Sequence, residues 1–100
     1  MQEVKVDTRI ATLTSRSGTI TAGGTAQDIA DSNENRSGFW MQNLGSSAIW
    51  FNFGVTAVAS QPSFRLDPGA FYETPPNGCP TGRVSIICAT TGQQFSAREF

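Results

Sequence analysis

The segment 36–54, RSGFWMQNLGSSAIWFNFG, restricts the fold of this chain more than any other. Residues 38–44 and 48–53 each show period-two spacing of large apolar side chains, and Gly45, Ser46 and Ser47 lie between them. This spacing, the aromatic content and the short Gly/Ser loop are typical of a β-hairpin. Five of the ten aromatic residues fall here, and each can bury roughly 150–250 Å². We therefore expect a hairpin of these two strands at the centre of an all-β core.

Short β-prone runs separated by turn residues occupy the rest of the chain. The expected strands are residues 17–21, 25–30, 64–66, 70–74, 83–90 and 93–100. The run 83–90, RVSIICAT, has the near-continuous apolarity of a buried strand, and 55–62 is expected to be a loop that crosses the sheet. About eight short strands with regular turns predict one domain, 1–100, folded as a β-sandwich or a jelly-roll-like barrel.

The N-terminal residues 1–15 alternate loosely and predict an extended strand or arm. One interpretation is an edge strand of the same domain. The other is an arm that pairs with a neighbouring subunit, because exposed sheet edges accept an added strand. In the second case Val4, Val6, Arg9 and Ile10 are the residues that would contact the neighbour.

Composition argues against several classes of partner. The net charge is −1 and there is no run of Lys or Arg, so we expect no nucleic acid. No apolar stretch approaches the ~20 residues that span a bilayer, so we expect no membrane. The N-terminal sequence MQEVKVDTRI lacks the apolar core of a secretion signal, which predicts synthesis in the cytoplasm without export by the usual route.

The sequence also disfavours catalysis, and we expect the protein not to be an enzyme. The chain has no histidine, so Ser–His and Cys–His nucleophile pairs are unavailable. Neither a GxGxxG nor a GxxxxGK phosphate-binding pattern occurs. A carboxylate pair for glycoside hydrolysis stays open at this point. Its candidates are Asp28, Asp31, Glu34, Asp67, Glu73 and Glu99.

We expect no metal and no cofactor. Without histidine, Cys79 and Cys88 cannot complete a zinc site within one chain. Cys88 is expected to be a small buried apolar residue, and a Cys79–Cys88 bridge is the alternative. The polar segment 31–35 offers oxygen ligands for calcium but lacks the EF-hand spacing, so we interpret it as a turn.

Three aromatic residues have two possible roles. Trp40, Trp50 and Tyr72 are suited to stacking on sugar rings, as in a carbohydrate-binding module, or to packing in the core or against another subunit. Trp40 alternates with Phe39 and Met41, so both faces of its strand carry large apolar groups. Both faces must then be covered, either within the domain or by a partner. Trp40 and Trp50 are therefore candidate interface residues.

The order of features over residues 30–100 resembles a group of small virion proteins of tailed bacteriophages. The elements that carry the resemblance are Asn35-Arg36, Gln42-Asn43, Ile49-Trp50-Phe51, Gly54, Leu66-Asp67-Pro68-Gly69, Phe71, Val84-Ser85-Ile86 and Glu99. Each element is short, and the first thirty residues lie outside the resemblance.

The resemblance implies a non-enzymatic structural protein on the virion head, such as a capsid decoration (cement) protein. Its implied partners are the major capsid protein and further copies of itself, with a trimer favoured. A tail-fibre, baseplate or tail-completion component with the same fold is the alternative, and a free carbohydrate-binding module is another.

Overall fold

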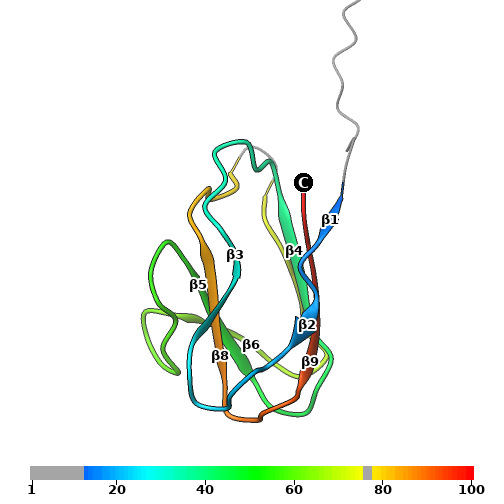
Figure 1. Cartoon of the computed structure of the whole chain (residues 1–100), viewed down its shortest axis with the longest axis vertical. Coiled ribbons are helices and arrows are strands. Elements are labelled where there is room, and N and C mark those ends of the chain that lie inside the picture. Colours follow the sequence, from blue (N-terminus) through cyan, green and yellow to red (C-terminus); the bar gives the residue numbers. More distant parts are fainter. Residues whose placement is uncertain (1–12, 76–77) are drawn as a thin grey trace, which may run out of the picture.

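The computed structural model describes residues 13–75 and 78–100, and within them the chain forms two antiparallel β-sheets and no helix (Figure 1). The strands are β1 (Thr14–Ser15), β2 (Gly18–Thr19), β3 (Gln27–Ala30), β4 (Phe39–Asn43), β5 (Ile49–Phe53), β6 (Phe64–Leu66), β7 (Phe71–Glu73), β8 (Val84–Cys88) and β9 (Gln94–Glu99). The two sheets face each other as a small β-sandwich, which confirms the expected all-β class. Positions 1–12 of the expected N-terminal strand or arm lie outside the described residues.

Sheet A has the order β1-β9-β4-β7, with β2 also paired to β9, and sheet B has the order β3-β8-β5-β6. Thr14 of β1 pairs with Glu99, and Gly18 of β2 pairs with Phe95, so β1 and β2 act as one interrupted edge strand along β9. The chain changes sheet after β2, β3, β4, β6, β7 and β8. Most connections therefore cross the ends of the sandwich, as Figure 1 shows.

The core lies between the sheets and consists mainly of alternate residues of the central strands β4, β5, β8 and β9. Strand β4 alternates between buried and half-buried residues, and β9 between exposed and buried ones. Phe39 and Phe53 meet edge to face across the core, with ring centroids 5.9 Å apart, a favoured aromatic geometry. The buried core residues are Ile20, Ala30, Phe39, Met41, Ile49, Phe51, Leu66, Val84, Ile86, Cys88, Phe95 and Ala97.

The expected hairpin of residues 38–44 and 48–53 is wrong. Strand β4 pairs with β7 and β9, whereas β5 pairs with β6 and β8 in the opposite sheet. The fully buried Asn43 directs the crossing, because its Nδ2 donates to the Ser47 carbonyl at 2.8 Å and its Oδ1 accepts from the Gly45 N–H at 2.9 Å. The Gln93 Oε1 accepts from the Ser47 N–H at 2.9 Å. These side-chain bonds satisfy the loop backbone that a hairpin ladder would otherwise satisfy.

The other expected strands are confirmed, and the loop that follows β5 explains the apolar run of β8. Residues 54–63 lie over the outer face of sheet B, where Ala57 is only 1% exposed. The Ala57 N–H donates to the Ser85 Oγ at 2.9 Å. Because sheet B is covered on both faces here, β8 is apolar or buried at nearly every position.

Candidate interaction face

The outer face of sheet A carries alternate residues of three neighbouring strands. Strand β7 contributes one end of each cross-strand row, β4 the middle and β9 the other end. In register order the rows are Glu73–Trp40–Arg98 and Phe71–Gln42–Ser96. We call these six residues, together with Phe100, the outer face of sheet A.

The outward direction of these side chains follows from their buried neighbours. Met41 of β4 and Ala97 of β9 are register partners and point into the core. Successive side chains of a strand point to opposite faces, so Trp40 and Arg98 must point outward. Glu99 is buried at 3% exposure, which in the same way directs Arg98 and Phe100 away from the core.

Aromatic side chains form the apolar part of this face. The Phe100 ring lies against Trp40 at a centroid distance of 5.0 Å, and it occupies the space above Gly38 that any side chain there would need. Phe71 is 54% exposed although it is a large apolar residue. An open groove of about 100 Å³ is bordered by Trp40, Gln42, Phe71, Ser96, Ala97 and Arg98.

Two opposite charges flank Trp40. Glu73 and Arg98 are its register partners on either side, and both are exposed. Among the described residues neither of them makes an ion pair, in contrast to Arg16, Arg36, Arg65 and Arg83. Within residues 13–75 and 78–100, no loop crosses this face in the way that residues 54–63 cross sheet B.

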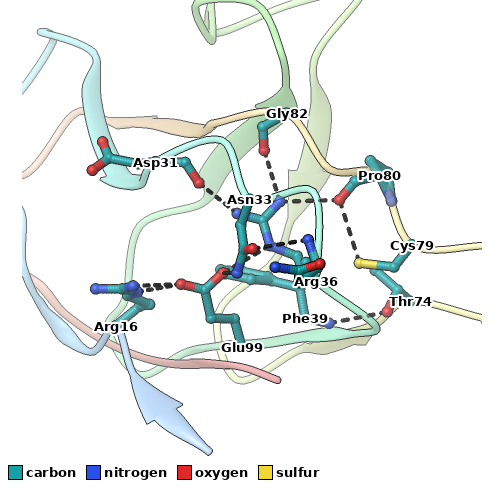
Figure 2. Close-up of polar contacts among 11 residues, drawn as sticks. Arg16, Asp31, Asn33, Arg36, Phe39, Thr74, Cys79, Pro80, Gly82 and Glu99 are labelled. Carbon is teal, nitrogen blue, oxygen red and sulfur yellow. Dashed lines mark hydrogen bonds and ion pairs between the residues drawn. The ribbon is translucent and has the colours of Figure 1, made fainter.

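Behind this face, a buried ion-pair cluster fixes the end of β9 (Figure 2). The Arg36 Nε donates to Glu99 Oε1 at 2.8 Å, and the Arg16 Nε donates to Glu99 Oε2 at 2.6 Å. The Arg36 guanidinium also donates to the carbonyls of Asp31, Pro80 and Gly82 at 2.8, 3.0 and 2.7 Å. It therefore joins two loops, the one that follows β3 and the one that precedes β8, to β9 at one end of the sandwich.

The two arginines change the acidity of Glu99. Burial alone would raise the pKa of its carboxyl group, since burial disfavours the charged form. The hydrogen bonds from Arg36 and Arg16 and their positive charges act in the opposite direction and prevail, so the pKa is lowered from its ordinary value. Glu99 is thus a carboxylate held in place by its partners, and Figure 2 shows both arginines directed at it.

The outer face of sheet B has a different character, because the chain itself supplies its cover. The Arg65 guanidinium lies 5.9 Å from the Trp50 ring centroid, and its Nε donates to Asp67 Oδ1 at 2.7 Å. Arg83 bridges Asp28 on β3 and Thr56 in the covering loop. Cation–π and hydrogen-bonding contacts therefore already engage this side.

A second hollow, of about 370 Å³, lies at the end of the sandwich opposite the ion-pair cluster. Polar groups and glycines dominate its lining. It is lined by Thr19, Leu44, Gly45, Ser46, Thr90, Thr91, Gly92, Gln93 and Gln94. The Gln93 side chain beneath it is already bonded to Asn43 and Ser47, so its polar groups are engaged in holding the loop.

The structure places the predicted interface residues in three different situations. Val4, Val6, Arg9 and Ile10 lie outside the described residues. Trp40 lies on the outer face of sheet A. Trp50 lies on the outer face of sheet B, beneath Arg65. The two tryptophans are therefore not part of one surface.

Sugar stacking was one of the two roles considered for Trp40, Trp50 and Tyr72, and the structure does not assemble such a platform. Tyr72 points into the sandwich, where its ring centroid lies 4.9 Å from that of Phe51. Burial raises the pKa of its hydroxyl group, and the nearby Cys79 adds to that effect. Trp40, Trp50 and Tyr72 thus lie on one outer face, on the other outer face and in the interior, respectively.

Other candidate groups have structural partners. Asp28 and Asp67 pair with arginines, and Glu99 belongs to the buried cluster. In the part of the chain that the structure describes, no three His, Cys, Asp or Glu residues gather as metal ligands, and no helix is long and apolar enough to cross a membrane. In the expected turn at 31–35, the Asn33 side chain accepts from the Asn35 N–H at 3.0 Å.

Both cysteines are free thiols. Cys88 is 2% exposed, which confirms the buried apolar role, and the alternative of a Cys79–Cys88 bridge is wrong. The two residues lie on different elements, because Cys79 is in the loop before β8 and Cys88 ends that strand.

Sequence reasoning did not identify Phe71, Arg98 and Phe100 as parts of a site, and it considered Glu73 only as a candidate catalytic carboxylate. The burial pattern puts Phe71 and Tyr72 on opposite faces of β7, and it puts Arg98 and Phe100 on the face opposite Glu99, as strand alternation requires. The missing information was that β4 lies between β7 and β9, which brings these residues to Trp40. Comparison of the chain with protein-family models, curated proteins and solved structures finds no match.

Proposed function

We propose that this chain is a non-enzymatic structural protein of a bacteriophage virion, a decoration protein that binds the major capsid protein and stabilises the head shell. The observation that supports it best is the aromatic outer face of sheet A, which no other described segment covers. A flat face with aromatic residues and flanking charges is typical of a surface that binds another protein. The resemblance of residues 30–100 to phage virion proteins supplies the class of partner.

Two contacts carry the proposed role. Residues Val4, Val6, Arg9 and Ile10 bind the capsid subunit, because their alternation suits strand addition to an exposed edge. The outer face of sheet A binds a neighbouring chain of the assembled coat. Many copies, each with a small interface, then reinforce the shell through multivalency.

Reconstitution tests this function. Shells stripped of the protein should lose integrity at a lower temperature, and adding the purified protein back should restore the original midpoint. The Ile10→Asp variant should fail to restore it, because a charge replaces an apolar contact, whereas the surface variant Val55→Ser should restore it fully. Stripped shells that are as heat-stable as complete ones would contradict the proposal.

Copy number distinguishes the head from the tail. A decoration protein should be present in hundreds of copies per particle, and quantitative mass spectrometry of purified virions measures this. A few to a few dozen copies would instead assign the protein to a tail or baseplate.

A further inference from the structure

The outer face of sheet A has a pattern that fits a copy of itself. In the row Glu73–Trp40–Arg98, a negative and a positive charge lie on opposite sides of an aromatic residue. Neighbouring strands are about 4.8 Å apart, so the two side chains start roughly 9.6 Å from each other. The inference rests on the proposed function to the extent that this face is a protein-binding surface.

The symmetry of the charges selects one arrangement. When two identical sheets pack face to face, the two-fold axis lies in the plane between them. An axis parallel to β4 reverses the row, so that Glu73 of one copy meets Arg98 of the other and Trp40 meets Trp40. An axis parallel to the row would instead place equal charges opposite each other, which is unfavourable.

The side chains of the second row are complementary in size under the same two-fold axis. Phe71 and Ser96 lie at opposite ends of the row Phe71–Gln42–Ser96, so one end is large and the other small. The axis parallel to β4 places the exposed Phe71 of one copy above Ser96 of the other. Ser96 borders the groove of about 100 Å³, so the ring has space there. Gln42 meets Gln42, and two side-chain amides can bond to each other.

We propose that the outer face of sheet A binds a second copy of this chain, with the two copies related by a two-fold axis parallel to β4. Five residues of β4 and three strands give a face about 17 Å long and about 14 Å wide. This is smaller than the roughly 800 Å² per partner of a standard stable interface. The dimer is therefore weak in dilute solution and becomes populated where copies are concentrated, as on a shell.

Charge-reversal substitutions test both whether the outer face of sheet A self-associates and whether the two copies are related by this two-fold axis. Sedimentation equilibrium of the full chain up to about 1 mM should give a monomer–dimer equilibrium. Arg98→Glu and Glu73→Arg should each raise the dissociation constant about tenfold, because two attractive contacts become repulsive. An equimolar mixture of the two variants should dimerise again as a heterodimer, and the double variant Glu73→Arg/Arg98→Glu should dimerise like the original chain.

Arg65→Glu is the matched control, because it makes the same charge change at an exposed position of sheet B and should leave the dissociation constant unchanged. Circular dichroism checks that every variant is folded. A chain that stays monomeric at about 1 mM, a trimer without a dimer, or a variant mixture that does not dimerise overturns the inference.

The shell reconstitution is scored separately from self-association. A monomeric chain that still stabilises shells refutes the two-fold contact alone. A dimer that does not bind shells refutes the decoration function alone.

Discussion

The two tryptophans of this chain occupy equivalent positions in consecutive strands, yet their surroundings differ. Trp40 is the second residue of β4 and Trp50 the second residue of β5, and both point away from the core. The Arg65 guanidinium of the same sheet lies against Trp50, and the loop 54–63 covers this outer face at Ser85. Trp40 has only the Phe100 ring against it as an aromatic neighbour in the described chain.

The difference shows that the alternation of apolar residues in a strand does not decide whether the chain itself covers the outer face of its sheet. The local sequences FWMQN and IWFNF are nearly interchangeable as alternating aromatic strands. What separates the faces is the loop between β5 and β6, because residues 54–63 lie over sheet B and no described segment lies over sheet A in the same way. We therefore expect an aromatic residue on the outer face of sheet B to serve stability, and one on the outer face of sheet A to serve the proposed self-association.

The largest expected effect on stability comes from breaking the buried ion-pair cluster that holds the end of β9. Arg36→Met leaves the carboxylate of Glu99 buried, with the half-exposed Arg16 as its one ion-pair partner and a long hydrogen bond of 3.5 Å from the Asn33 Nδ2. Removing one member of a buried pair typically costs about 3–5 kcal/mol, and we expect this loss in the free energy of unfolding by urea denaturation. The exposed pair provides the control, since Arg65→Met should cost less than about 1 kcal/mol. Equal losses in both variants would contradict the assigned role of the cluster.

Acid should weaken the same cluster without any substitution. The folded pKa of Glu99 lies below its ordinary value of 4.5, so its contribution to stability is complete above that pH and is lost as the pH falls through the folded pKa. The loss should be smaller than that of Arg36→Met, because the protonated side chain stays in place. Urea denaturation between pH 6 and pH 3 measures it, and Glu99→Gln should show a flatter dependence below pH 4.5. Parallel curves for the two proteins would refute this assignment.

A smaller loss of stability should follow from weakening the contact between the loop 54–63 and the outer face of sheet B. Ser85→Ala removes the acceptor of the buried Ala57 N–H, and an orphaned buried donor costs about 1–2 kcal/mol. We expect a lower melting temperature and faster amide exchange at Ala57, but unchanged self-association. Ser96→Ala is the matched substitution on sheet A and should leave the stability nearly unchanged. If both serine variants lose the same stability, the two outer faces do not differ as described.

Much of the fold could be predicted from the sequence, because most of the strands carry local signals. Alternation identified β4, β5, β7 and β9, and turn residues separated them. The buried character of β8 followed from its continuous apolar run. These are short-range properties of the chain, and they do not depend on which strands pair.

Pairing itself could not be predicted in the same way. Strands 38–44 and 48–53 were expected to form a hairpin because a short loop joins them, but the buried Asn43 and Gln93 route that loop between sheets. Alternation is the same for strands that pair and for strands that face each other. The part of the site around Trp40 was missed for the same reason, since Glu73 and Arg98 are distant in sequence and adjacent only through β4.

The smallest expected effect on stability gives the clearest test of the comparison. Phe71 and Phe64 are the two most exposed large apolar residues in the described chain, at 54% and 62%, and they lie on the edge strands of opposite sheets. Substitutions at exposed positions usually change stability by less than about 0.5 kcal/mol, so Phe71→Ser and Phe64→Ser should unfold almost like the original chain. Phe71→Ser alone should abolish self-association in sedimentation equilibrium, because its ring belongs to the outer face of sheet A. If Phe64→Ser weakens association equally, both sheets contribute to the contact, and the distinction between a sealed face and a binding face fails.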